Sequence, residues 1–455
     1  MSEKTVKAGS AEVVLEVPLF AELAGYGPFF GRRNLGCRDA LYCRVFSLSD
    51  GARRNLLIVS DVLSTDAAEC RFMRKQLAAT FNLCEEGILF MGTHTHSAPL
   101  IGSSSIGYGE VCPEFVAGWR KSVFAAVKTA LADEETLHAF AGRAKLRKKL
   151  GQNRADPQNG HCDPEIRWVK LQRKDGSVKA LLHNHAMHGV VFGRQQRLAS
   201  ADWMGDANRK IKERKLAEIP FFLYGCAGDI NVIWTHPKPE ERELNLEWIS
   251  QSYVDDLQLS LAEGGQELNL APLAAAMQSC ELPTEPVSAA QLRGDAARLL
   301  AKLPSPHAAL LQYMHDRMLE MAVLKDQGHK FACRQDLQYL GMGDLALFAI
   351  PGEPFIALGE KIMQEAKSRF PLALSCANGA AGYFPSPEMF ARYPEQLCCD
   401  DYGAFGFYEV WFGPSKHRAK FKANIVEFIT QSLLALESKN DAALNKSGEG
   451  NPKPI

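Results

Sequence analysis

The chain has 455 residues, of which 46% are hydrophobic and 23% charged, and its formal net charge at pH 7 is −1. These values are ordinary for a globular protein, and the charge indicates neither a nucleic-acid nor an anionic-membrane partner. The opening segment lacks the apolar stretch of a signal peptide, and no run approaches the ~20 apolar residues that span a bilayer. We therefore expect a cytoplasmic protein without an integral membrane segment.

The first part of the chain alternates strand patterns with helix patterns. Strands are predicted over residues 11–17, 41–50, 55–64 and 87–96. Helices are predicted over residues 65–82, with Thr65 or Asp66 as the N-cap, and over residues 114–133.

The remainder repeats this alternation. The predicted strands are residues 167–173, 178–192, 220–234 and the beginnings of the segments 345–370 and 372–386. A helix is predicted over residues 202–218, and another in the second half of the segment 345–370.

This order predicts an α/β fold with a layered mixed sheet flanked by helices and an active site at the strand ends. We expect a single hydrolase domain over residues 1–436. Residues 238–330 are mostly helical in pattern and predict an insert or cap within that domain. The polar segment 437–455 predicts a disordered tail.

Five predicted strands end in acidic or metal-competent residues, and functional residues of α/β folds gather at such ends. These positions are Asp61, "THTH" at 93–96, "NHAMHG" at 184–189, "GDIN" at 228–231 and "PGE" at 351–353. One such end carries little information, but five of them predict a common site.

The "THTH" segment carries two histidines one residue apart. In an extended strand His94 and His96 would point to the same side, and Thr93 and Thr95 to the other. Two imidazoles on one face can hold a metal or divide the roles of ligand and proton carrier. A polar strand end with two solvated histidines is the alternative.

Residues in three further segments each have a structural and a functional interpretation. Among His183, His185 and His188, the last is nearest the strand end and is the best candidate ligand. Asp202 can cap a helix or orient a histidine from behind. Glu353 follows a Pro-Gly turn, where it can favour a helix N-terminus or act as a carboxylate ligand.

Cysteines are numerous but scattered. The 12 of them show no C-x-x-C spacing, which is typical of buried thiols in a cytosolic protein. The adjacent Cys398 and Cys399 leave open a reactive pair.

These pieces, in this order, resemble the neutral, non-lysosomal ceramidase family over most of residues 15–430. The matching segments are "GYG" near residue 26, "LYCRVF", "THTHSAP", "QNRADP", "HAMHGVVFG", "SADWMGDA", "GCAGDIN", "AIPGEPF", "ANGAAGYFPSPEMF" and "FYEVWFG".

The resemblance implies one zinc ion per chain. The ligands it implies are His94, His188, Glu353 and Tyr383. Such a set leaves room for a water molecule, whose pKa zinc lowers to ~7, so that hydroxide can attack an amide carbonyl.

The resemblance also implies three catalytic residues. His96 is the proton carrier for the leaving amine, and Arg154 and Tyr408 stabilise the developing oxyanion. Where longer family members have a serine in the "GDIN" segment, this chain has Asn231, which favours direct attack by water.

The sequence therefore predicts a zinc-dependent amidohydrolase that cleaves a linear N-acyl bond of a small-molecule or lipid amide. One alternative keeps the metal but changes the bond to an ester, a lactone or a small non-lipid amide. Another is a metal-stabilised binding protein without turnover. The presence of His96, Arg154 and Tyr408 argues against the last, because a scaffold needs no acid–base group beside its metal.

Overall fold

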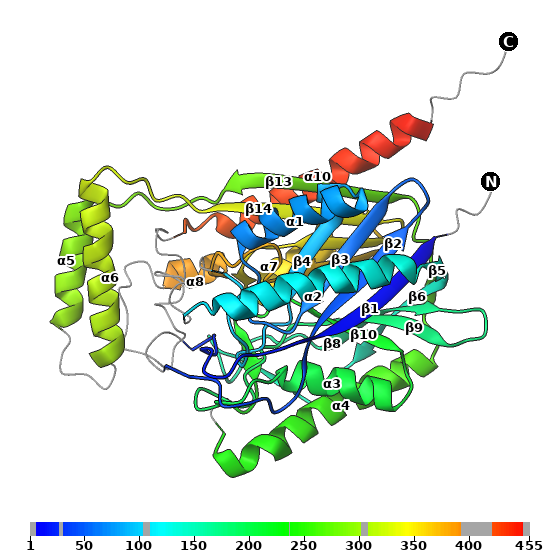
Figure 1. Ribbon diagram of the computed structural model, residues 1–455. Coiled ribbons are helices and arrows are strands. Elements are labelled where there is room, and N and C mark those ends of the chain that lie inside the picture. The colour runs from blue at the N-terminus through cyan, green and yellow to red at the C-terminus, as the bar shows by residue number, and fades with distance from the viewer. Residues whose placement is uncertain are drawn as a thin grey trace.

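Figure 1 shows the computed structural model of the chain. It describes residues 6–26, 31–102, 110–235, 237–301, 308–392 and 421–448. Among the helices in these ranges, none combines the length and the hydropathy needed to cross a bilayer.

The N-terminal sheet has the strand order β4-β3-β2-β1-β5. Its strands are β1 (Lys7–Leu15), β2 (Leu41–Ser49), β3 (Arg54–Ser60), β4 (Ile88–Gly92) and β5 (Glu135–Thr136). Helices α1 (Ala67–Phe81) and α2 (Pro113–Ala132) cover one face of it (Figure 1). Asp66 caps α1 by accepting hydrogen bonds from the main-chain N–H groups of Ala68 and Glu69, so one of the two predicted caps is confirmed.

Both faces of this sheet are buried, which explains the continuous apolar runs in the sequence. In β3, Leu56 and Ile58 pack under α1 and α2, whereas Leu57 and Val59 face the core shared with a second sheet. Alternate residues of a strand point to opposite faces, so an uninterrupted apolar run supplies both cores.

The second sheet has the order β10-β9-β8-β6-β12 and is covered by α3 (Asp202–Glu213) and α4 (Arg242–Ala262). Its strands are β6 (His138–Lys145), β8 (Glu165–Gln172), β9 (Val178–His185), β10 (Ile219–Tyr224) and β12 (Gln266–Leu268). The rings of Phe46 and Phe221 meet between the two sheets with centroids 6.0 Å apart. The molecule therefore has helix, sheet, sheet and helix layers, which confirms the predicted α/β class.

A third sheet, β13-β14-β15-β17, packs against α7 (Ile356–Glu365) and α10 (Ile425–Gly448). Its strands are β13 (Leu273–Glu281), β14 (Arg334–Met342), β15 (Leu345–Ala349) and β17 (Phe370–Leu374). A short helix, α8 (Pro387–Arg392), precedes the undescribed segment. Two small ladders complete the fold: β7 (Gly151–Asn153) with β11 (Ile230–Val232), and β16 (Glu353–Pro354) with β18 (Tyr383–Phe384).

Residues 238–330 are only partly the helical insert that the sequence predicts. α4 covers the second sheet, and β12 and β13 are strands of the second and third sheets. Only α5 (Ala289–Leu300) and α6 (Ala308–Asp326) form a helical pair that stands apart from the sheets (Figure 1). The strand partners lie far away in the sequence, where local periodicity cannot reveal them.

Several predicted boundaries also differ from the structure; for example, the strand predicted over residues 178–192 ends at His185. The predicted strand 220–234 is divided into β10 and β11, with a turn at residues 225–229 between them. α10 continues to Gly448, so residues 437–448 are helical where the sequence predicts the start of a disordered tail.

Candidate active site

His94 and His96 do not lie in a strand, so the predicted extended conformation is wrong. β4 ends at Gly92, and His94 has a left-handed backbone with φ of 69°. The chain leaves the ladder here because the His94 N–H donates to Val62 O and the His96 N–H to Gly189 O. The two rings nevertheless converge, with their Nε2 atoms 3.3 Å apart.

His188, Glu353 and Tyr383 meet these rings from two other parts of the chain. Glu353 and Tyr383 are direct partners in the parallel β16–β18 ladder. Glu353 Oε2 lies 3.3 Å from His94 Nε2 and 3.4 Å from His188 Nε2. The Tyr383 hydroxyl lies 3.5 Å from His188 Nε2.

These distances fit a tetrahedral metal. Ligand atoms ~2.0–2.1 Å from a tetrahedral zinc ion lie about 3.3–3.4 Å from one another. Glu353 Oε2 is buried and accepts no hydrogen bond from a described residue, although its carboxylate stands between two imidazoles. The rings of His94, His96 and His188 also form a buried group whose nitrogens could hold an ion.

Main-chain carbonyls fix the orientation of two of the three imidazoles. His94 Nδ1 donates to Leu63 O at 2.8 Å, and His188 Nδ1 donates to Ile230 O at 3.0 Å. A carbonyl only accepts, so each Nδ1 carries a proton, and in the corresponding neutral tautomer each Nε2 presents its lone pair to the site. This is the tautomer that an Nε2 metal ligand requires.

The protonation states suit the same role. Burial lowers the pKa of His188 to about 4 and, helped by His94 and His188, lowers that of His96 well below its usual range. Burial alone would raise the pKa of Glu353, but the neighbouring His94 and His188 hold it well below its usual range. At neutral pH the site therefore combines an ionised carboxylate with His96 and His188 in their neutral form.

Arg154 completes the group of predicted residues that the fold brings together. It follows β7, and its N–H donates to Asp229 O at 2.6 Å. Its guanidinium donates to the Tyr383 hydroxyl at 3.3 Å and to Gly228 O at 3.5 Å. Gly228 packs tightly against the backbone of Glu353, because a Cβ at position 228 would lie 2.5 Å from Glu353 O.

Two histidines and Asp61 have structural partners instead. His183 contacts the Tyr253 hydroxyl and the Asn208 side chain, and His185 donates to Glu165 O. Asp61 accepts hydrogen bonds from the Tyr42 N–H and the Arg44 guanidinium.

Asp202 begins α3 with φ of 55° and accepts hydrogen bonds from the N–H groups of Val191 and Trp203. It thus supports the loop that follows His188, and Trp203 Nε1 donates to His188 O at 2.9 Å. Tyr408, Cys398 and Cys399 lie outside the described residues.

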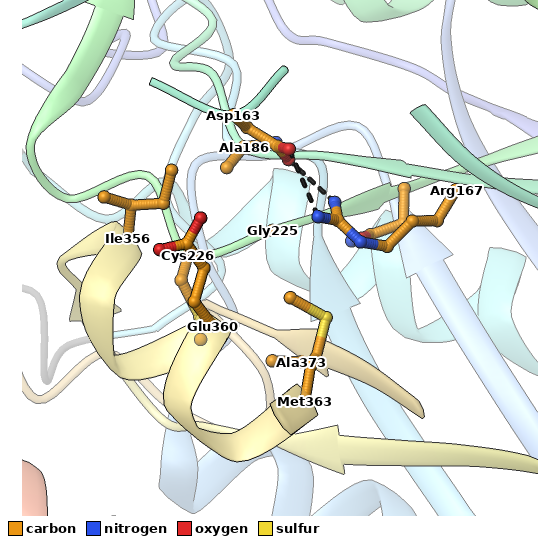
Figure 2. A pocket seen from close by; sticks show the side chains of 11 residues that line it. Asp163, Arg167, Ala186, Gly225, Cys226, Ile356, Glu360, Met363 and Ala373 are labelled. Atoms are coloured by element: carbon orange, nitrogen blue, oxygen red, sulfur yellow. Dashed lines mark hydrogen bonds and ion pairs between the residues drawn. The ribbon is translucent and has the colours of Figure 1, made fainter. Parts of the chain in front are cut away.

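A small cavity is lined by residues of β8, β9, α7 and β17 and the adjoining loops (Figure 2). Its volume is about 10 Å³, and its walls include the paired side chains of Asp163 and Arg167 together with Cys226 and Glu360. Such a volume accommodates at most one water molecule. The cavity contains none of the predicted site residues, so it is not a substrate pocket.

The sequence missed three residues around the histidines. The Tyr224 ring stacks on His94 with centroids 4.5 Å apart, and its hydroxyl lies 3.3 Å from His188 Nδ1. Tyr26 and Arg32 contact His96. Two sequence features could have indicated the tyrosines. Tyr224 is an aromatic residue at the end of the apolar run "PFFLY", and Tyr26 lies between two glycines in "GYG".

Neither a protein-family model nor a curated protein sequence matches the chain. Solved structures do match it, among them two ceramidases. A neutral ceramidase from Pseudomonas aeruginosa superposes with a TM-score of 0.73 and 16% identity over 96% of this chain and 75% of that chain. A ceramidase complexed with C2 gives a TM-score of 0.72 and 15% identity over 99% of this chain and 77% of that chain. The chain therefore has the fold of the neutral ceramidases.

Proposed function

We propose that this protein is a zinc-dependent amidohydrolase that cleaves a linear N-acyl amide. The observation that supports it most directly is the position of Glu353 Oε2. It is buried, lacks a hydrogen-bond donor among the described residues, and lies 3.3 and 3.4 Å from the Nε2 atoms of His94 and His188. A carboxylate oxygen in that position is suited to a cation.

The residues that would hold one zinc ion are His94, His188, Glu353 and Tyr383. Bound there, zinc would supply a Lewis acid and a water molecule of lowered pKa. The carbonyl-anchored Nδ1 atoms of His94 and His188 favour these two imidazoles as ligands over His96.

His96 and Arg154 are the proposed catalytic residues within the described chain. Neutral His96 can accept a proton and deliver it to the leaving amine. The Arg154 guanidinium, next to the Tyr383 hydroxyl, can stabilise negative charge on the substrate carbonyl oxygen. Tyr408 remains in the proposal as a second donor to that oxygen.

The proposed substrate class is supported by the two fold neighbours, both of which are ceramidases. We propose an N-acyl amide, with a lipid amide as the leading candidate. Hydrolysis of non-lipid amides, esters and lactones would use the same zinc-bound water, proton carrier and oxyanion-stabilising residues, so these compounds are tested in the same assay.

The experiment is hydrolysis of fluorogenic N-acyl amides of increasing acyl length, with an ester and a lactone of matched acyl group. Each is measured on the purified protein, after chelation, and after zinc is added back. We expect about one zinc per chain, loss of amide hydrolysis on chelation and recovery with zinc. If chelation only lowers the stability of the protein and no substrate is hydrolysed in any of the three states, the protein is instead a metal-stabilised binding protein.

A further inference from the structure

His96 is held by a different kind of contact from the other two histidines. Among the described residues, nothing forms a hydrogen bond with its buried Nδ1, whereas the Nδ1 atoms of His94 and His188 each donate to a carbonyl. The orientation of the His96 ring must therefore come from packing and from its main chain. Gly189 O accepts a hydrogen bond from the His96 main-chain N–H. The rings of His94 and His188 pack on one side of the His96 ring. The remaining contacts are made by residues 23–26 and Arg32, which we call the His96 cradle.

Arg32 is the centre of the cradle. Its side chain is 4% exposed and forms no ion pair with any residue that the structure describes. One terminal nitrogen donates to His96 O at 2.6 Å and also to Leu23 O and Ala24 O. The other donates to Gln196 O at 3.2 Å.

A buried guanidinium without an acidic partner is costly, and most buried arginines are paired. Here main-chain carbonyls accept the hydrogen bonds that the guanidinium donates to described residues, one of them from His96, and Glu22 acts on it only as a more distant charge. The arrangement ties the His96 backbone to residues 23 and 24, and the Ala24 N–H also donates to Ala98 O.

Tyr26 and Gly25 act on the ring itself. The Arg32 guanidinium lies 4.6 Å from the centroid of the Tyr26 ring. That ring in turn meets the His96 imidazole edge-on, with centroids 4.9 Å apart. Gly25 has φ of 106°, and a Cβ there would lie 2.4 Å from His96 Nδ1, so only glycine allows this approach.

From these contacts we propose that Arg32 and Tyr26 are positioning residues for His96, acting through a guanidinium–phenol–imidazole stack and through the Arg32–His96 main-chain hydrogen bond. The expected change in kcat rests on the proposed function, whereas the expected change in the orientation of the His96 ring does not. An imidazole that carries a proton needs a fixed direction for Nε2. Packing supplies that direction, and Nδ1 forms no hydrogen bond with a described residue that would fix its tautomer.

The test is a comparison of Arg32→Ala with Arg33→Ala in the zinc-loaded protein. Arg33 is the adjacent residue, 43% exposed and paired with Glu110, so it controls for loss of a positive charge. We expect Arg32→Ala to lower kcat about 10- to 100-fold, with KM and zinc content unchanged, and Arg33→Ala to leave all three unchanged. Arg32→Lys should recover only part of kcat, because lysine lacks the planar fork, and added guanidinium should partly rescue Arg32→Ala.

Tyr26 gives an independent pair of variants should Arg32→Ala fail to fold. Tyr26→Phe keeps the ring and should retain kcat, whereas Tyr26→Leu should lower it. Equal kcat for Tyr26→Leu and the wild type would overturn the proposal.

Imidazole nitrogen NMR separates this inference from the proposed function. With the His96 signal identified by His96→Gln, Arg32→Ala should shift or split that signal and leave those of His94 and His188 unchanged. If the wild type hydrolyses no substrate, the proposed function fails and this spectrum still decides the inference. An unchanged His96 signal would refute it.

Discussion

The three histidines of the site differ in how the protein holds them. His94 and His188 lie in separate loops, yet each is fixed by an Nδ1–H bond to a carbonyl, from Leu63 and Ile230 respectively. His96 has no such bond to a described residue and is surrounded by Gly25, Tyr26 and Arg32 instead. The difference separates an imidazole fixed in one tautomer, as a metal ligand requires, from one whose protons can exchange.

The most severe test of this comparison removes the carboxylate between the two anchored rings. Glu353→Gln should lower zinc affinity more than about 100-fold and abolish hydrolysis, because loss of a direct ligand exceeds the ~10–100-fold effect of outer partners. Elemental analysis and a zinc titration measure it. Glu360→Gln, in α7 and paired with His161 on the surface, is the matched control. Full zinc occupancy in Glu353→Gln would remove Glu353 from the ligand set.

The second test addresses the unanchored ring. His96→Gln should retain about one zinc per chain and lose roughly 10²- to 10⁴-fold in kcat, the usual contribution of a general acid–base group. Zinc content and kcat are measured on the same preparation. Loss of zinc together with activity would instead place His96 among the ligands, in agreement with the buried three-histidine group.

A third, smaller effect concerns the residue that supports both anchored rings. Tyr224→Phe keeps the stack on His94 but removes the hydroxyl 3.3 Å from His188 Nδ1. Because the Ile230 carbonyl still accepts from that nitrogen, we expect zinc affinity to fall by about 10-fold or less. A competition titration with a chromogenic chelator measures it. An effect as large as that of Glu353→Gln would show that the carbonyl alone does not fix His188.

The smallest effect is on stability and depends on pH. Asp202 supports the loop after His188, and burial raises its pKa from 3.8 to about 7. As pH rises from ~4 to ~7, the carboxyl ionises in the unfolded chain but stays protonated in the fold, so it progressively destabilises the protein. Asp202→Asn should therefore gain stability over the wild type with rising pH, by a few kcal/mol at most.

Urea unfolding at pH 5 and pH 7.5 checks this sign. Asp175→Asn, in an exposed turn, should show nearly the same difference from the wild type at both values. A gain for Asp202→Asn that shrinks as pH rises would mean that the folded protein holds Asp202 ionised.

Much of the layered fold follows from the sequence alone. Apolar runs identified the central strands of the first two sheets, and the polar residues at their ends indicated where the site lies. Resemblance to one family then selected His94, His96, His188, Glu353 and Arg154, which the fold brings together. These signals are local: they depend on strand periodicity and on which residue follows a strand.

Only the tertiary structure decided how these residues are oriented. The left-handed backbone of His94, the pairing of Glu353 with Tyr383 and the sheet partner of β13 all depend on hydrogen bonds between segments far apart in sequence. The same holds for Arg32, whose carbonyl partners come from three loops. A side chain's partners are set by packing, so the sequence determined which groups reach the site, and the fold determined which of them are fixed by hydrogen bonds and which by packing alone.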